Sequence, residues 1–469
     1  MAPSPRRHPS RPHATSHPTR RGVLGSALAL AGLGTAGCAT EEQASAVPGG
    51  AAPSTELDPD LHAAAVDAAS ALAGGKEWGG SIEYIGPNGG AEGAIMQKVY
   101  SAFTEATGTE VNYTGSQDSN NIVQSRVQAG NPPAVADLAL GVAQAYAADG
   151  HLLDLGEVVG HDVLAENYPP SLLEAASWDG TVFGIYQGFS NFMLWYNPSA
   201  YTGPADPGSW QELVDWTTAR AEQGLSTWGI AEESGASSGF PGAQFIEVLF
   251  AKKHGPELLR RWGSGDLPWT SDEVADAWRM FGALAANPDT VAGGVTGSLA
   301  APIASGYSGL VTSPEDMQAS VWGSWLPGLV GGQVKPGENL DFMPVPASDP
   351  AFASTEIFQS TVAIGFQDTE PVRAFLQYAA SPEAQTLLAS ADQWTVSNTK
   401  VPSSTYSSPL LQRAAETFFS DDATLATGPN VLADAATGAA FYRGVVAYLQ
   451  DPDSLEDILA TLDATAKGA

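Results

Sequence analysis

Aromatic residues and short polar side chains share several loops of this 469-residue chain. Indole and phenol rings can lie flat on the C–H faces of a sugar, while carboxylates, amides and hydroxyls form hydrogen bonds with its hydroxyl groups. The polar candidates are Asn88, Asp118, Gln144, Ser190, Asn191, Glu233 and Ser234. The aromatic candidates are Phe240, Trp322, Trp325, Phe358 and Trp394. Each aromatic taken singly is more typical of a hydrophobic core, so only the group as a whole favours a carbohydrate-binding site.

The sequence contains no motif of the common catalytic families. It has no Walker A loop, no G-x-S-x-G, no H-E-x-x-H and no cysteine-based metal site, so we predict no cofactor and no metal. The histidines that follow the first 37 residues are isolated ones, at His62, His151, His161 and His254. The adjacent Glu232 and Glu233 permit a glycosidase hypothesis. That reaction needs two carboxylates about 5–10 Å apart across a sugar, however, and neighbours in a loop usually point apart.

The formal net charge of the chain is −32, from 20 basic and 52 acidic residues. A surface this acidic repels nucleic acids and anionic lipid headgroups, so we predict no nucleic-acid partner. The hydrophobic fraction of 43% and the 12 tryptophans are typical of a globular protein. The length allows two or three domains with a large core.

The first 37 residues have the features of an export signal. They carry five arginines and no acidic residue, followed by a short apolar segment at 23–36. The Arg20–Arg21 pair is typical of twin-arginine export, and Thr35–Ala36–Gly37–Cys38 resembles a bacterial lipobox. Cys38 is the only cysteine. A lone cysteine is often a small buried hydrophobe, but this position predicts lipidation and anchoring to the outer face of the cell membrane.

Residues 38–79 have the composition of a flexible tether. Within it, Asp58 can cap a helix that begins at Pro59 and ends near Leu72, before Gly74. The sequence does not show whether this helix packs on the rest of the protein.

From Gly80 onward, stretches typical of strands alternate with stretches typical of helices. The predicted strands are 81–85, 110–113, 134–140, 228–231, 342–346 and 360–366. The predicted helices are 92–107, 122–129, 209–223, 243–254 and 274–286, with others beginning at 371, 382, 409, 438 and 454. Short connections between alternating strands and helices predict an α/β fold with a parallel sheet covered by helices.

One apolar stretch, 183–198, is interrupted by a polar residue and a glycine at Gln187 and Gly188. By itself it is typical of a buried strand with a bulge at Gly188. The alternative is a strand that crosses from one lobe to another and breaks between Gln187 and Ser190. An α/β segment on each side, together with the family resemblance described next, favours this alternative. Trp195 then lies beyond the break and packs in the second lobe.

Five segments, in order along the chain, carry a resemblance to a known family. They are Gly130–Asn131–Pro132–Pro133 with 134–138; Met193–Leu194–Trp195–Tyr196–Asn197–Pro198; Ser209–Trp210–Gln211–Glu212–Leu213; 233–236 with 238–242; and 374–376 with 381–385. From Gly80 to its C-terminus the chain resembles the extracellular solute-binding proteins of bacterial ABC sugar importers, in the type II, maltose-binding-like group. Within that group it is similar to the α-glucoside-type binding lipoproteins of actinobacteria.

The resemblance implies a periplasmic-binding-protein type II fold of two α/β lobes, with hinge-crossing segments and a ligand cleft between the lobes. The first lobe would comprise 80–187 and 354–394, and the second 188–353 and 395–469. The loops beginning at Gly86, Ser116 and Glu233 would face the cleft, as would the 322–325 region.

The function implied by the resemblance is that of a receptor without enzymatic activity. It would bind an oligosaccharide outside the cell and deliver it to the permease of an ABC transporter, as a lipid-anchored monomer. Two alternatives stay open at this point: a secreted glycan-active hydrolase, and a receptor of the same fold for a non-sugar solute such as a polyamine or a polyol phosphate. Sparse basic residues near the predicted cleft argue against a phosphorylated ligand.

Overall fold

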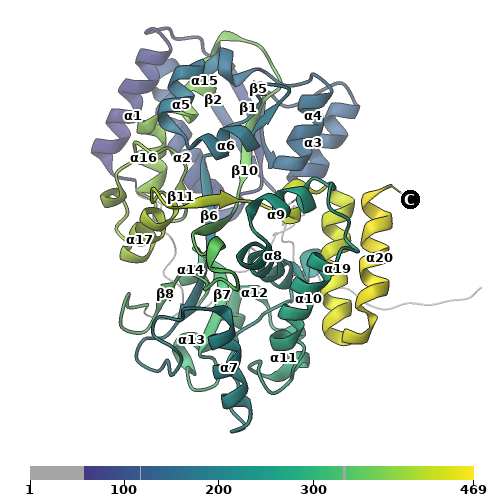
Figure 1. Cartoon of the computed structure of the whole chain (residues 1–469). Helices are drawn as coiled ribbons and strands as arrows, with labels where there is room; N and C mark the ends of the chain where they lie inside the picture. Colours follow the sequence, from purple (N-terminus) through teal and green to yellow (C-terminus); the bar gives the residue numbers. More distant parts are fainter. Residues whose placement is uncertain (1–56, 117, 331–333, 469) are drawn as a thin grey trace, which may run out of the picture. The chain divides into compact units, whose positions relative to one another are not determined.

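The computed structural model describes residues 57–468 except for 117 and 331–333 (Figure 1). The leader, the lipobox and Cys38 lie outside these described residues. Among the helices of the described part, none combines the length and the apolar character needed to cross a bilayer.

The first lobe is built on a four-stranded sheet in the order β10-β3-β1-β2. Its strands are β1 (Ser81–Gly86), β2 (Glu110–Gly115), β3 (Val135–Ala139) and β10 (Thr361–Gly365). The first three run parallel, and β10, which comes from much later in the chain, pairs antiparallel with β3 (Figure 1). The predicted parallel sheet is therefore confirmed, with one antiparallel strand added at its edge.

Helices surround this sheet, and their apolar residues join its core. They are α1 (Pro59–Leu72), α2 (Gly90–Thr107), α3 (Ser119–Gln128), α4 (Leu140–Ala148), α5 (His161–Asn167), α6 (Pro170–Ala175), α15 (Glu370–Ala379) and α16 (Pro382–Ala389). A short hairpin of β4 (Ser177–Trp178) and β5 (Thr181–Val182) follows α6. Parallel strands such as β3 need both faces covered, which explains why four of its five residues are buried.

Helix α1 has the bounds that the sequence predicts. Asp58 caps it by accepting from the backbone N–H groups of Asp60 and Leu61, at 2.8 and 3.1 Å. Ala65 and Ala69 are fully buried in the core of the first lobe. From Asp58 onward the predicted tether is therefore folded against the first lobe, because small alanine side chains allow close approach of α1 to its neighbours.

The second lobe is built on a six-stranded sheet centred on β6 (Gly188–Tyr196). The other strands are β7 (Ala319–Gly323), β8 (Asp341–Met343), β9 (Thr355–Gln359), β11 (Thr395–Val396) and β12 (Thr424–Ala426). The first residues of β6 pair with β11 and β9, and the later ones with β7 and β8. Trp195 is buried in this lobe, as predicted.

Most of the helices that follow β6 pack in this lobe. They are α7 (Trp210–Ala221), α8 (Phe240–His254), α9 (Pro256–Gly263), α10 (Asp272–Ala285), α11 (Gly294–Ala300), α12 (Ile303–Gly306), α13 (Gly309–Thr312), α14 (Leu326–Leu329), α18 (Pro429–Leu432), α19 (Ala435–Gln450) and α20 (Leu455–Ala466). Helix α8 is buried along most of its length, so the core of this lobe surrounds it. Helix α17 (Pro409–Phe418) contributes Leu411 to the first-lobe core and Leu410 to the second.

The lobe boundaries differ from the prediction in two places. Strand β9 belongs to the second sheet, although 354–394 was expected in the first lobe. Conversely, Val396 and Tyr406 lie in the first-lobe core, although 395–469 was expected in the second. The first difference arises because Ser360 alone separates β9 from β10, so the chain changes sheets there and not at Ser354.

The break predicted between Gln187 and Ser190 lies at the start of that interval, just before Gly188, where an uninterrupted β6 begins. Two crossing segments are joined at this point, because the Ser360 hydroxyl donates to the Gly188 carbonyl at 2.5 Å. A Cβ at Gly188 would lie 3.0 Å from the Cβ of Trp394, so a larger residue would push against the segment that leads into β11.

Candidate functional site

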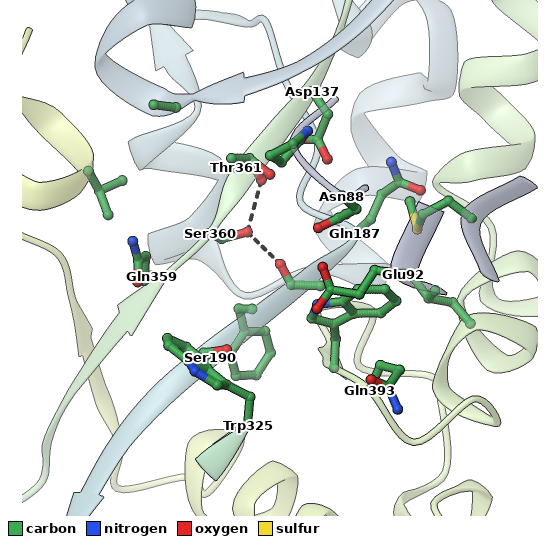
Figure 2. Close-up of a pocket in the computed structure, with 18 of the residues that line it drawn as sticks. Asn88, Glu92, Asp137, Gln187, Ser190, Trp325, Gln359, Ser360, Thr361 and Gln393 are labelled. Atoms are coloured by element: carbon green, nitrogen blue, oxygen red, sulfur yellow. Dashed lines mark hydrogen bonds between the residues drawn. The ribbon is translucent and has the colours of Figure 1, made fainter. Parts of the chain in front are cut away.

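A cavity of about 360 Å³ lies where the crossing segments meet residues of both lobes (Figure 2). First-lobe elements supply Asn88, Glu92, Asp137 and Thr361, and second-lobe elements supply Phe240 and Trp325. The remaining lining residues are Pro87, Met96, Ala139, Gln187, Gly188, Phe189, Ser190, Gln359, Ser360, Leu388, Gln393, Trp394, Asn430 and Val431. We call this cavity the cleft.

The turn after β1 positions Asn88 at the cleft. Its backbone N–H donates to the Tyr113 hydroxyl at 3.1 Å. Its carbonyl oxygen lies so near Gly115 that a Cβ there would be only 1.8 Å away, so this approach of the turn to β2 requires glycine. Gly90, at φ 56°, then begins α2. The sequence of the turn therefore fixes where Asn88 and the first turn of α2 face the cleft.

Glu92 stands in that first turn of α2. Its side chain is half-buried, and it forms no hydrogen bond or ion pair with any residue that the structure describes. Figure 2 shows it extending into the cleft beside Asn88. Burial raises the pKa of Glu92 above its ordinary value. An unpaired carboxyl in this position is available to a ligand.

Asp137 lies on β3 and is 5% exposed. Burial raises its pKa to about 6, although a hydrogen bond with the Thr361 side chain opposes this shift. Burial raises the pKa values of Tyr84, Tyr100 and Tyr113 above 10, and the nearby charge of Asp137 raises them further. At neutral pH the cleft therefore holds one deeply placed carboxylate among neutral phenols.

Gln187 is held in place by the same tyrosines. Its Nε2 donates to the Tyr84 hydroxyl at 2.6 Å, and the Tyr100 hydroxyl donates to its Oε1 at 2.9 Å. Because its amide is fixed by first-lobe residues, Gln187 anchors the crossing segment to the first lobe at the position where β6 begins.

Three half-buried aromatic rings line the cleft. Phe240, the first residue of α8, packs edge-on against Trp322 at 5.8 Å between ring centroids. Trp325 packs edge-on against Phe192 at 6.0 Å. Trp394 lies against Gly188 at the crossing. Partial burial holds each ring in position and leaves part of its surface for a ligand.

The cleft presents acidic, amide, hydroxyl and aromatic groups. None of the described residues that line it is lysine, arginine or histidine. Such a surface suits a ligand that donates hydrogen bonds and has apolar faces, and it disfavours an anion.

The cleft brings together part of the set of residues proposed from the sequence. Those that line it are Asn88, Ser190, Phe240, Trp325 and Trp394. Those that are buried away from its lining are Asn191, whose Nδ2 donates to the Ala414 carbonyl at 3.3 Å, and Trp322, which stacks on Tyr307. Those that are exposed elsewhere are Asp118, Glu233 and Ser234.

Gln144 and Phe358 line a second cavity of about 410 Å³. Phe358 and Gln359 are neighbours on β9 and so point to opposite faces of the strand. One lines the second cavity and the other lines the cleft.

The adjacent acids Glu232 and Glu233 have different environments. The Glu232 carboxyl is fully buried and accepts from the backbone N–H of Gly242 at 3.2 Å. Glu233 is exposed and accepts from the backbone N–H of Gly235 at 3.1 Å. They do not form a pair across a shared site.

Several cleft residues were missed from the sequence: Glu92, Asp137, Gln187, Gln359, Ser360, Thr361, Gln393 and Asn430. The sequence does contain a signal for Asp137. An acid inside the apolar stretch 134–140 would be costly to bury in an ordinary strand, which indicates a special environment. Glu92 is the first residue of the predicted helix 92–107, and an acid there is typical of a favourable charge in the first turn.

The family model for the bacterial extracellular solute-binding proteins matches residues 98–420. An osmoprotective compounds-binding protein of Synechocystis is 24% identical over 389 residues, covering 81% of this chain and 91% of the relative. An alpha-glucosides-binding periplasmic protein of Rhizobium meliloti is 26% identical over 391 residues, covering 81% and 85%.

The fold is similar to that of a solved chitin oligosaccharide binding protein, with a TM-score of 0.69 and 20% identity over 83% of this chain and 98% of that one. This likeness confirms the expected two-lobed type II fold. The match over most of the chain and the two-sheet architecture lead to one conclusion: the chain belongs to the bacterial extracellular solute-binding proteins.

Proposed function

We propose that this protein is a receptor without enzymatic activity that binds a short oligosaccharide in the cleft, outside the cell membrane, and delivers it to the permease of an ABC transporter. The observation that carries the proposal is the composition of the cleft. Half-buried rings such as Trp325 face polar groups such as Asn88, and they come from different lobes. Rings and hydrogen-bonding groups together are what recognition of a sugar requires.

The names of similar proteins support a sugar ligand. One curated relative is named for alpha-glucosides, and solved structures of the same fold are described as a chitin oligosaccharide binding protein and as a complex with raffinose. The cleft volume of about 360 Å³ is near the small end of the range for ligand pockets, about 300–1,000 Å³. We therefore favour a short oligosaccharide over a long one.

Ligand capture would be coupled to a change in the angle between the lobes. A ligand that touches Glu92 on one side and Trp325 on the other gains contacts with both lobes only when they approach each other. That difference in contacts is what shifts a conformational equilibrium. The short crossings at Gly188 and Ser360 are the natural hinge, because the chain passes from one sheet to the other there.

Thermal-shift measurements against mono-, di- and oligosaccharides, amines and polyol phosphates would test the proposal. Binding to the folded state raises the melting temperature by mass action, so we expect stabilisation by at least one short oligosaccharide. Each stabilising sugar is then incubated with the protein, and the products are analysed. Stabilisation by amines or phosphates alone would overturn the sugar ligand, and turnover of the sugar would overturn the receptor.

We further propose that lipidation of Cys38 anchors a monomeric protein to the outer face of the membrane after twin-arginine export. The spacing of the leader and the lipobox-like segment supports this. Cell fractionation and intact-protein mass measurement test it with Cys38→Ser. We expect loss of the lipid mass and release from the membrane, and a variant that stays membrane-bound at unchanged mass contradicts the proposal.

A further inference from the structure

The ionisable groups of the cleft are of one sign. Its carboxyls are Glu92 and Asp137, and the described residues that line it include no cationic side chain. Figure 2 shows both carboxyls, together with the Asn88 amide, turned toward the interior of the cleft. A half-buried Glu92 and a buried Asp137 on the same cavity, with no positive group to balance them, leave uncompensated negative charge at the site.

Neither carboxyl forms a salt bridge with a residue that the structure describes. Glu92 has no hydrogen-bond or ion-pair partner in the described part of the chain, and the partner of Asp137 is the neutral side chain of Thr361. Asp137 is buried, so water does little to stabilise its charge. Burial shifts the pKa of both carboxyls upward, which is the sign of charge held at a cost.

We propose that the ligand of the cleft is a short sugar that carries a protonated amino group, with Glu92 and Asp137 as its anchors. The inference rests on the proposed function and narrows its ligand class to amino sugars. An ammonium group would form charge-assisted hydrogen bonds with the carboxylates, and these are about twice as strong as neutral ones. It could also lie against the indole face of Trp325.

The charge of the whole chain supports the same ligand class. A formal net charge of −32 attracts cations and repels anions at long range. A neutral sugar can also donate hydroxyl hydrogen bonds to carboxylates, so the presence of Glu92 and Asp137 alone does not decide between the two. An amino sugar differs from a neutral sugar in the affinity that it gains from its positive charge. A matched pair of sugars measures this gain.

Calorimetric titration compares sugars that differ only by an amino group in place of a hydroxyl in each ring: glucosamine with glucose, galactosamine with galactose, and the β-1,4-linked disaccharide of glucosamine with cellobiose. In at least one pair we expect the amino sugar to bind about tenfold more tightly at neutral pH. Added salt should weaken the amino sugar and leave the neutral one unchanged, because salt screens charge interactions.

Glu92→Gln keeps the size and the hydrogen-bonding capacity of the side chain and removes its charge. We expect it to reduce the preference for the amino member of the pair to about threefold or less. Glu105→Gln is the matched control, because Glu105 lies on the same helix α2 but is exposed and pairs with His62. The control should keep the full preference.

The outcomes separate the inference from the proposed function. If neutral sugars bind as tightly as their amino partners, the amino-sugar inference is wrong and the sugar receptor stands. If amines without a sugar ring, such as spermidine, bind and sugars do not, both are wrong. If Glu92→Gln keeps the preference, Glu92 is not the anchor and the inference is wrong.

Discussion

Each lobe contains a pair of carboxyls whose pKa is raised by burial, but the two pairs differ in what surrounds them. In the first lobe, Glu92 and Asp137 line the cleft. In the second lobe, Glu232 and Glu247 are buried in the core and lie away from the cleft lining. Burial raises the pKa of all four, to about 8 for each second-lobe acid.

The second-lobe acids are occupied by backbone groups at the starts of helices. Glu232 accepts from the N–H of Gly242 in the first turn of α8, and Glu247 accepts from the N–H of Asn430 at 2.6 Å, at the start of α18. These are helix-capping contacts. A raised pKa therefore indicates a ligand site only where the carboxyl also faces a cavity and does not cap a helix through backbone N–H groups.

The largest effect that we predict concerns the core pair and is one of stability. The folded-state pKa of Glu247 is about 8 against an ordinary 4.5. The contribution of its carboxyl to folding stability is therefore fully present below about pH 4.5 and is lost as the pH rises through 8. Glu247→Gln removes this titration. Between about pH 5 and 8, its free energy of unfolding should fall by roughly 1–3 kcal/mol less than that of the unmodified protein.

Denaturant unfolding at several pH values measures this difference. Glu222→Gln, at an exposed acid of the same lobe, is the control and should follow the unmodified protein. If Glu247→Gln follows it as well, Glu247 does not titrate as its burial implies.

Removal of a cleft ring should have the next largest effect. Trp325→Ala deletes the indole on the second-lobe side, and we expect affinity for the bound sugar to fall at least about tenfold. Trp325→Phe keeps an aromatic face and should lose less. The melting temperature of each variant without ligand checks that the contact with Phe192 is not what was lost. Unchanged affinity in Trp325→Ala would place the sugar elsewhere.

Asp137 should give ligand affinity a dependence on pH. Below its pKa of about 6 the carboxyl is neutral and a weaker acceptor, and above it the carboxylate is available. Affinity should therefore rise about threefold to tenfold between about pH 5 and 7. The facing groups are Tyr84, Tyr100 and Tyr113, whose raised pKa values keep them neutral over this range, with Thr361 and Glu92.

Asp137→Asn should reduce this rise, and titration calorimetry across the range measures it. Because the pKa of Glu92 is also raised, Glu92→Gln serves as the comparison. The affinity of the double variant for the ligand should not change with pH over this range. A rise that persists in the double variant would show that another group controls the pH dependence.

The smallest effect concerns Asp118, which the sequence places among the ligand-binding residues. It is exposed, precedes α3 and accepts from Asn121 Nδ2 at 2.6 Å, outside the cleft lining. Asp118→Ala should therefore change affinity by less than about threefold. A loss as large as that of Trp325→Ala would show that the ligand reaches this loop and would restore the sequence-based site.

The order and type of the elements followed from local chemistry. Asp58 before Pro59 specified the start of α1, and the apolar stretch 134–140 specified β3. Ser271 likewise caps α10, because its hydroxyl accepts from the backbone N–H of Val274. Such features depend on neighbours in the chain, so the sequence alone determined them.

Contacts between segments far apart in the sequence determine which residues line the cleft. Strand β9, which the sequence did not predict, joins β6 in the second sheet, and the alternation along β9 sends Phe358 away from the cleft and Gln359 into it. Ser190 and Asn191 are likewise neighbours with opposite orientations, and one lines the cleft while the other is buried. A strand's residue types do not reveal which of its faces meets a cavity, because that depends on what packs against it.

Family resemblance and composition thus identified an α/β binding protein with aromatic and polar residues suited to a sugar. Only the tertiary structure decided that Glu92 and Asp137 share a cavity, since they lie on a helix and a strand that packing brings together. The physical reason is that burial and access to a cavity belong to the folded arrangement of the chain, whereas helix caps, turns and strand patterns are fixed by residues a few positions apart.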